Sequence, residues 1–133
     1  MAGLTPLTDL PATRGLVLFA HGSRDPLWRA PIEAVAQLVQ HQHTDARCVC
    51  AYLELSTPDL PTACQNLVAA GCTQITILPM FLGTGRHARN DLPALVEALR
   101  LQHTQVQFCI ATAVGEDARV TQLLADIAAE HIA

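Results

Sequence analysis

Lysine is absent from this sequence, and all eight of its basic residues other than histidine are arginines. The formal net charge is −4, and no basic run with interleaved aromatic side chains occurs. Proteins that hold nucleic acid through a basic surface need the opposite balance, because the phosphate backbone is recognised mainly by positive charge. We therefore expect no nucleic acid among the partners of this chain.

The sequence also lacks a C-x-x-C pair. Its five cysteines are odd in number and lie in apolar surroundings, which argues against a disulfide framework and against a structural zinc site. Small buried thiols in a reducing compartment are the expected state. Soft-metal or redox chemistry at Cys48 and Cys50, which would share one face of a strand, is the alternative.

Long apolar runs are missing as well. No stretch reaches the roughly 18 apolar residues that a membrane-spanning helix needs. The first fourteen residues carry neither the basic start nor the apolar stretch of a secretory signal. We expect a flexible leader over residues 1–14, a cytoplasmic protein and no membrane partner.

Apolar residues are nevertheless abundant, at 50% of a chain of 133 residues. A chain of this length fits one domain with a sizeable core, expected here over residues 15–133. Short apolar runs of strand length recur at near-even intervals, at residues 15–20, 47–54, 74–81 and 105–112. Apolar side chains repeat every three or four positions, which predicts helices, at residues 26–41, 58–71, 90–102 and 116–132.

The alternation of these runs indicates the fold class. Strands joined by such short helical crossovers are parallel, and the crossovers are right-handed. We expect an α/β fold with a small doubly wound four-stranded parallel sheet, helices on both faces and the flavodoxin-like strand order 2-1-3-4. A sheet of this size leaves an edge or a face that a second copy could cover.

Polar clusters follow the first three expected strands. In open α/β sheets, ligands bind beyond the carboxyl ends of the strands, at the point where the strand order reverses. The clusters are HGSRD after the first strand, ELS after the second and GTGRHARND after the third. The first and third strands are neighbours in the expected order, so His21 and His87 should face one crevice.

Glu54 lies at the end of the second expected strand. A carboxylate there is penalised by desolvation unless it meets a positive charge, a hydrogen-bond donor or a metal. Two imidazoles and one carboxylate form a recurrent ligand set for divalent first-row metals. The structural alternative is that Glu54 caps the following helix or pairs with an arginine.

More than one role is possible for several neighbouring residues. Ser23 fits a turn better than a nucleophile, because the G-x-S-x-G elbow is absent. Asp25 can pair with Arg24, orient His21 or cap the following helix. Asp91 is expected to be the N-cap or a first-turn residue of the third helix, with a contact to the histidine four residues earlier as the alternative.

Three stretches carry a family resemblance. In their order and spacing, LVLFAHGSRDP, AYLELSTPDLP and ITILPMFLGTGRHARNDLP resemble the class II tetrapyrrole chelatases, specifically the small sirohydrochlorin chelatases of the CbiX and SirB group. The resemblance covers roughly residues 14–115 and implies a chelatase-like lyase that works without ATP. Its reaction would insert Co²⁺ for the cobalamin route, or Fe²⁺ for sirohaem, into sirohydrochlorin. The leader and the lack of a His-rich tail depart from the family pattern.

The resemblance also assigns residues. It makes His21 and His87 the catalytic and metal-site positions, with Glu54 as a further metal ligand. An imidazole can both hold the ion and accept pyrrole protons near neutral pH. The carboxylates of an anionic tetrapyrrole would meet the substrate-binding residues, which are Ser23, Arg24, Gly85, Arg86 and Arg89.

No organic cofactor is implied, because the divalent metal is itself a substrate, and the ligand types accept Ni²⁺ as well. The resemblance further implies a homodimer with the macrocycle between its subunits. A non-catalytic carrier of metal or tetrapyrrole with the same fold is the alternative function, and a hydrolase using Ser23 is a weaker one.

Overall fold

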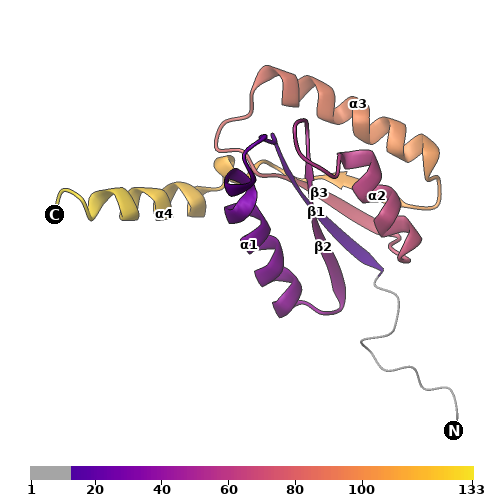
Figure 1. Ribbon diagram of the computed structural model, residues 1–133, viewed down its shortest axis with the longest axis horizontal. Helices are drawn as coiled ribbons and strands as arrows, with labels where there is room; N and C mark the ends of the chain where they lie inside the picture. Colours follow the sequence, from indigo (N-terminus) through magenta and orange to yellow (C-terminus); the bar gives the residue numbers. More distant parts are fainter. Residues whose placement is uncertain (1–12) are drawn as a thin grey trace, which may run out of the picture.

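The computed structural model describes residues 13–133, with all their side chains except that of His87. Most of the expected leader lies outside the described residues. Figure 1 shows the chain, whose elements are β1 (Arg14–Ala20), α1 (Pro26–Gln42), β2 (Ala46–Tyr52), α2 (Leu60–Ala69), β3 (Gln74–Pro79), α3 (Arg86–Gln102), β4 (Gln107–Ile110), the 3₁₀ helix η2 (Val114–Glu116) and α4 (Ala118–Ala129).

The four strands form one parallel sheet in the order β2-β1-β3-β4, which confirms the predicted topology. β1 and β3 are the central neighbours and run in register from Arg14 beside Gln74 to Phe19 beside Pro79. The loops that follow β1, β2 and β3 therefore leave the sheet at the same edge. We call this the carboxyl edge.

One face of the sheet is closed by two helices. Alternate strand residues such as Val17, Ile75 and Ile77 are almost completely buried beneath α2 and α3. The helices contribute a repeat of buried side chains, which in α3 consists of Ala88, Leu92, Val96 and Leu99. This layer contains most of the hydrophobic core. Its buried helical side chains recur every three or four residues, which is why the helical pattern could be read from the sequence.

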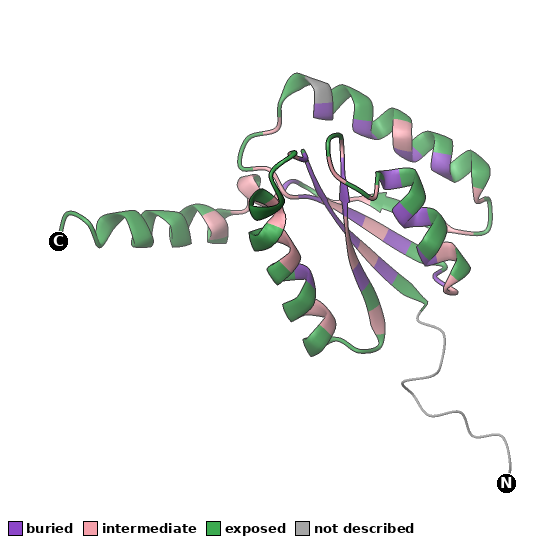
Figure 2. Cartoon of the chain, in the orientation of Figure 1, coloured by how far each residue is buried: buried purple, intermediate pink, exposed green. Residues whose placement is uncertain are grey.

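The opposite face carries α1. Ala36 is buried there against Leu18 and Cys48, so helices do cover both faces as predicted. α1 packs on β2 and, less extensively, on β1. α4 extends away from the sheet beyond α1, and although every one of its residues is described, none is buried (Figures 1 and 2).

Two element boundaries differ from the sequence prediction. β2 ends at Tyr52, so Glu54 lies in the following loop rather than at the strand end. α3 begins at Arg86 with Gly85 as its N-cap, and the prediction that Asp91 caps this helix or lies in its first turn was wrong. Among the side chains described in the first turn of α3, Ala88 alone is buried, so the apolar repeat begins to show at Leu92.

No helix in the described part of the chain combines the length and the apolar character that crossing a bilayer requires.

Candidate metal and substrate site

The loops after β1 and β2 remain hydrogen-bonded beyond the ends of their strands. The Leu53 N–H donates to the Ala20 carbonyl at 2.9 Å, and the Glu54 N–H donates to the His21 carbonyl at 3.0 Å. These bonds continue the ladder of the sheet into the loops. As a result, His21 and Glu54 are held side by side by their main chains.

Gly22 permits this close approach. Its φ is +106°, and a Cβ built on it would lie only 1.6 Å from the Glu54 carbonyl oxygen. A residue with a side chain would meet both a left-handed backbone conformation and a main-chain clash. The glycine after His21 is therefore required for the two loops to lie against one another.

The side chains of His21 and Glu54 meet directly. Nε2 of the imidazole lies 2.9 Å from Oε1 of the carboxylate, and the two side chains are 53% and 55% exposed. A contact this exposed stabilises a fold by about 1 kcal/mol at most. Nε2 of His21 and Oε1 of Glu54 are possible metal-ligand atoms, and both belong to side chains at the protein surface that an incoming cation can reach.

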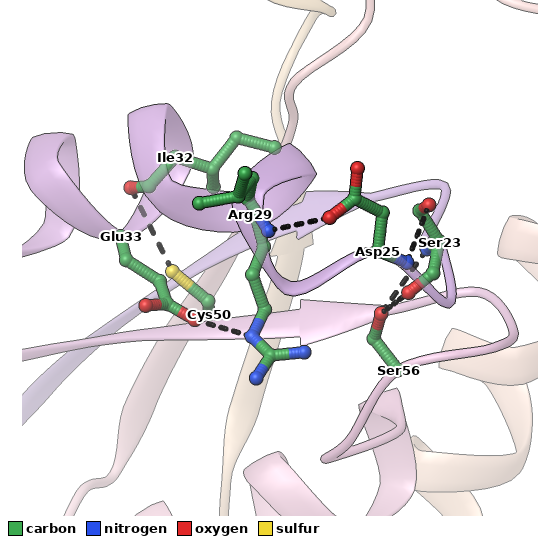
Figure 3. A network of polar contacts seen from close by, with 8 residues as sticks. Ser23, Asp25, Arg29, Ile32, Glu33, Cys50 and Ser56 are labelled. Atoms are coloured by element: carbon green, nitrogen blue, oxygen red, sulfur yellow. Dashed lines mark hydrogen bonds and ion pairs between the residues drawn. The ribbon is translucent and has the colours of Figure 1, made fainter.

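Ser56 also joins the same two loops, through hydrogen bonds to Ser23 (Figure 3). Its hydroxyl donates to the Ser23 carbonyl at 2.7 Å and accepts from the Ser23 N–H at 3.1 Å. The Ser23 hydroxyl oxygen accepts the Asp25 N–H at 3.1 Å, which is a turn role. Ser56 was not among the sequence-predicted site residues, because a serine in a loop carries no signal of its own.

Asp25 is the N-cap of α1. Its Oδ1 accepts the Leu27 N–H at 2.9 Å, so capping is the role that the structure gives it among the three considered. The cap fixes where the loop after His21 ends and α1 begins. Arg29 in the first turns of α1 is bound to Glu33, with Nε 2.9 Å from Oε1 (Figure 3).

Leu55 adopts an unusual conformation beside Glu54. Its φ is +65° and its side chain is 52% exposed. A left-handed conformation is unfavourable for a residue with a Cβ by about 1–2 kcal/mol, and such residues cluster at functional sites. The Ser56 N–H holds the turn by donating to the Glu54 carbonyl at 2.8 Å.

The loop after β3 brings the third predicted cluster to the carboxyl edge. Gly85 precedes α3, Arg86 is its first residue, and Arg89 donates its N–H to the Gly85 carbonyl at 3.1 Å. The side chains of Arg86 and Arg89 are exposed. Position 87 is the second residue of α3, and its side chain lies outside the described part of the structure.

The structure thus brings together one pair of the three predicted ligands. Among the side chains it describes, no three histidine, cysteine, aspartate or glutamate residues form a cluster that could hold a metal. His21 and Glu54 place two possible ligand atoms side by side, and the ligand roles of His21, Glu54 and His87 all stay predictions.

The same edge carries apolar as well as basic side chains. Arg24 is exposed in the loop after β1. Large apolar side chains at this edge are also exposed, by 80% at Leu27, 52% at Leu55 and 67% at Leu82. Sequence reasoning missed these leucines because their exposure is set by tertiary packing, which apolar periodicity does not show. A surface of this composition suits a flat, apolar molecule with anionic substituents.

The thiols on β2 are poorly suited to metal or redox chemistry. Burial, with the neighbouring Cys50 as a smaller cause, raises the pKa of Cys48 to about 11. Burial also raises the pKa of Cys50, whose Sγ is 3.8 Å from the Ile32 carbonyl oxygen. Both groups stay protonated at neutral pH, whereas the thiolate is the reactive form.

Comparison with known families settles the relationship. The model of the CbiX family matches residues 15–131. The chain belongs to the CbiX family. The resemblance carried by the three sequence stretches is thereby confirmed.

Relatives of this CbiX-family chain include two archaeal proteins named sirohydrochlorin cobaltochelatase. The protein from Methanosarcina acetivorans is 26% identical, over 89% of this chain and 93% of its own length. The protein from Saccharolobus solfataricus is 28% identical, over 83% of this chain and 89% of its own length.

Solved structures agree on the fold. A protein from Marinobacter aquaeolei VT8, described as a CbiX protein of cobalamin (vitamin B12) biosynthesis, superposes with a TM-score of 0.78 at 33% identity, over 90% of this chain and 97% of its own. The sirohydrochlorin chelatase SirB from Bacillus subtilis subspecies spizizenii, solved with cobalt, gives a TM-score of 0.73 at 22% identity. That match covers 83% of this chain and 47% of the SirB chain, and it concerns the fold alone.

Proposed function

We propose that this CbiX-family chain is a sirohydrochlorin chelatase, a lyase that inserts Co²⁺ or Fe²⁺ into the macrocycle without ATP, in cobalamin or sirohaem biosynthesis. The observation that carries the proposal is the exposed His21–Glu54 pair, fixed at the carboxyl edge by main-chain hydrogen bonds. Relatives named sirohydrochlorin cobaltochelatase support the same reaction.

In this mechanism the divalent metal is a substrate. His21, Glu54 and His87 receive it as it sheds water, because imidazole and carboxylate both bind Co²⁺, Fe²⁺ and Ni²⁺. Insertion releases two pyrrole protons, and the imidazoles of His21 and His87 accept one each near neutral pH. Glu54 adds negative charge that stabilises both the cation and a protonated His21.

The macrocycle lies over the carboxyl edge. Its carboxylates pair with the arginine side chains at positions 24, 86 and 89, since guanidinium groups bind carboxylates in a bidentate manner. Its apolar ring system contacts the exposed side chains of Leu55 and Leu82. The loop backbone at Ser23 and Gly85 approaches the same substrate.

The working form is a homodimer in the cytoplasm, with the macrocycle between two copies of a single unit formed by residues 15–133. No organic cofactor takes part in the reaction. A small parallel sheet with one incompletely covered face supports association with a second copy.

The decisive experiment is a metal insertion assay. Purified protein is mixed with sirohydrochlorin and Co²⁺, Fe²⁺ or Ni²⁺ in turn, and the absorbance change of the macrocycle is compared with the uncatalysed rate. We expect catalysed insertion that falls at least about 100-fold in the His21→Ala variant, the scale of a lost acid–base group. His41→Ala is the matched control, because His41 is an exposed residue at the far end of α1.

Two results would contradict the proposal. Full activity of the His21→Ala protein would remove His21 from the reaction. Stoichiometric binding of metal or macrocycle without turnover would instead favour the carrier function.

A further inference from the structure

A hollow of about 240 Å³ opens at the carboxyl edge, between the first turns of α3, the ends of β3 and β4, and η2. We call it the α3 hollow. None of its lining residues belongs to the loops after β1 and β2, so it is separate from the His21–Glu54 pair. Thr84, in the loop that carries the third polar cluster, is one of its lining residues, which places the hollow beside the proposed substrate site.

The interior of the α3 hollow is apolar. Ala88 and Leu92 of α3 and Ala113 before η2 are buried and form its floor. Pro79 and Ile110, the last residues of β3 and β4, add apolar walls. Such an interior favours the methylene groups of a ligand over a bare ion, because burying apolar surface is favourable and desolvating a charge is costly.

The rim of the α3 hollow carries two opposite charges. Arg89 and Glu116 are exposed lining residues. Among the side chains that the structure describes, neither of these two forms an ion pair or a hydrogen bond. Arg100, three turns further along α3, is by contrast held by Glu97 and by the Phe108 carbonyl. Arg89 is therefore a cation available to an anionic group of a ligand.

Main-chain hydrogen bonds hold the walls of the α3 hollow in place. The Ala111 N–H donates to the Ile77 carbonyl at 2.9 Å, which continues the ladder of β3 and β4 beyond the end of β4. The Gly115 N–H donates to the Phe81 carbonyl at 2.9 Å, and a Cβ on Gly115 would lie 1.9 Å from the Leu82 carbonyl oxygen. The hollow is thus formed before a ligand arrives, which reduces the free-energy cost of binding.

The size of the α3 hollow limits what can enter. Sites for whole drug-sized molecules measure about 300–1,000 Å³. The hollow is smaller, at about 240 Å³, and a tetrapyrrole macrocycle is larger than such molecules. Only one of its side arms can therefore enter. An arm of methylene groups that ends in a carboxylate matches both the apolar interior and the guanidinium of Arg89 at the rim.

Glu116 limits how tightly such an arm is held. Its carboxylate repels an anionic group bound beside Arg89, and at an exposed rim solvent and salt weaken this repulsion without removing it. The affinity for the arm is therefore lower than Arg89 alone would give. Because the metallated product carries the same arms as the substrate, a lower affinity favours release of the product.

We propose that the α3 hollow binds one carboxylate-bearing side arm of the tetrapyrrole, with Arg89 pairing with the carboxylate and Glu116 opposing it. The proposal rests on the proposed function and deepens it, because it names the part of the substrate that enters a defined subsite. An arm anchored there fixes the rotation of the macrocycle over the carboxyl edge. Arg89 and Glu116 are then residues that determine substrate specificity and product release.

The test measures binding of metal-free sirohydrochlorin by absorbance titration, in the absence of any metal. We expect Arg89→Gln to raise the Kd about tenfold, because a charge-assisted hydrogen bond to the arm is lost. Glu116→Gln should act in the opposite direction and lower the Kd about threefold, because a repulsive charge is removed. In the insertion assay the effect of Arg89→Gln should appear in KM rather than in kcat, since the arm does not take part in the chemical step.

Matched control variants change the same charges elsewhere. Arg47→Gln removes an exposed arginine near the start of β2, at the opposite edge of the sheet. Glu97→Gln removes a carboxylate from the last turns of α3. Both should leave the Kd for sirohydrochlorin unchanged.

A further variant distinguishes the α3 hollow from the open surface around Arg89. Ala111 lines the hollow, so Ala111→Leu places a larger apolar side chain inside it and leaves both rim charges in place. We expect this variant to bind sirohydrochlorin as weakly as Arg89→Gln does, with its helical circular dichroism retained. Ala111→Ser, which adds little volume, is the matched control and should bind normally.

The outcomes separate the subsite from the reaction. An unchanged Kd in folded Ala111→Leu, or a weaker rather than tighter complex with Glu116→Gln, would overturn the subsite while leaving the proposed function intact. An unchanged Kd in Arg89→Gln would do the same. Kd values that change as expected in a protein that inserts no metal would support the subsite and contradict the proposed function.

Discussion

Nε2 of His21 lies 2.9 Å from Oε1 of Glu54, although the two residues are 33 positions apart in the sequence. The contact joins the loops after two neighbouring parallel strands. Because both side chains are about half exposed, the pair adds little to stability and presents two donor atoms to solvent. The proposed metal site needs such an arrangement, because it has to receive the ion and pass it on.

Glu54→Gln should weaken metal binding while leaving the fold intact. The amide keeps the size of the side chain but removes its charge, so we expect the affinity for Co²⁺ to fall at least about tenfold. Isothermal titration of the protein with Co²⁺ measures this change. Glu97→Gln is the control, because Glu97 pairs with Arg100 in the last turns of α3. Equal affinities in the two variants would remove Glu54 from the ligand set.

Gly22→Ala should destabilise the protein. The added Cβ would lie 1.6 Å from the Glu54 carbonyl oxygen at a φ of +106°, so the loops must separate. We expect the free energy of unfolding to fall by about 2 kcal/mol or more. Urea denaturation measures the loss. Gly83→Ala in the loop after β3 is the control, because a Cβ there meets nothing within 4 Å. Equal stabilities of the two variants would show that the close approach does not constrain position 22.

Ser56→Ala should loosen the contact between the same two loops. The change leaves the partly buried N–H and carbonyl of Ser23 without their partner, at a cost of about 1–2 kcal/mol in the free energy of unfolding. Because Ser56 positions the loop that holds Glu54, the affinity for Co²⁺ should fall as well.

The control for this change is Ser23→Ala, which removes one hydrogen bond, to the Asp25 N–H, rather than two. Chemical denaturation and Co²⁺ titration are compared between the unmodified protein, the Ser56→Ala variant and the Ser23→Ala variant. An unchanged affinity in the Ser56→Ala protein would limit Ser56 to a structural role.

Stability should fall at alkaline pH. Burial raises the pKa of Cys64 to about 12 and that of Cys48, together with the nearby Cys50, to about 11. An unfolded chain loses these protons near pH 8.5, so the folded form binds more protons between about pH 8.5 and pH 11. Folding stability is therefore complete below about pH 8 and falls as the pH rises through this window.

Each such thiol contributes at most about 1.4 kcal/mol of loss per pH unit. Urea denaturation at pH 7, 8, 9 and 10 measures the slope. Cys64→Ala removes one titrating thiol, so its slope should be shallower even if its stability at pH 7 is lower. Identical slopes would show that Cys64 does not contribute to the pH dependence.

The fold was predictable because its signals are local and repeated. The alternation of apolar runs and helical repeats led to the expected strand order. It also led to the two helix layers, because alternate residues of β1 and β3 face different helices. Helix starts were less predictable where they are set by backbone alone. Gly85 caps α3 without a side-chain hydrogen bond, and so the first turn of the helix carries no recognisable signal.

The site was predictable in its residue types and only partly in its geometry. His21 and Glu54 were expected at one edge, and the structure adds that they touch. The positive φ of Leu55 and the hydrogen bonds between Ser56 and Ser23 arise from how two loops meet. The two serines are 33 residues apart in the sequence. Such relationships depend on tertiary contacts, which one sequence does not display.

The main chain aligns the His21–Glu54 pair, because the Glu54 N–H donates to the His21 carbonyl and the loops pack closely at Gly22. Side chains at the two positions are therefore interchangeable without rebuilding the loops. In the proposed metal site, a second imidazole or a thiolate at position 54 would meet the cation at the same place and alter which cation is held. Under the proposed function, the metal preference could then be changed independently of the loop backbone.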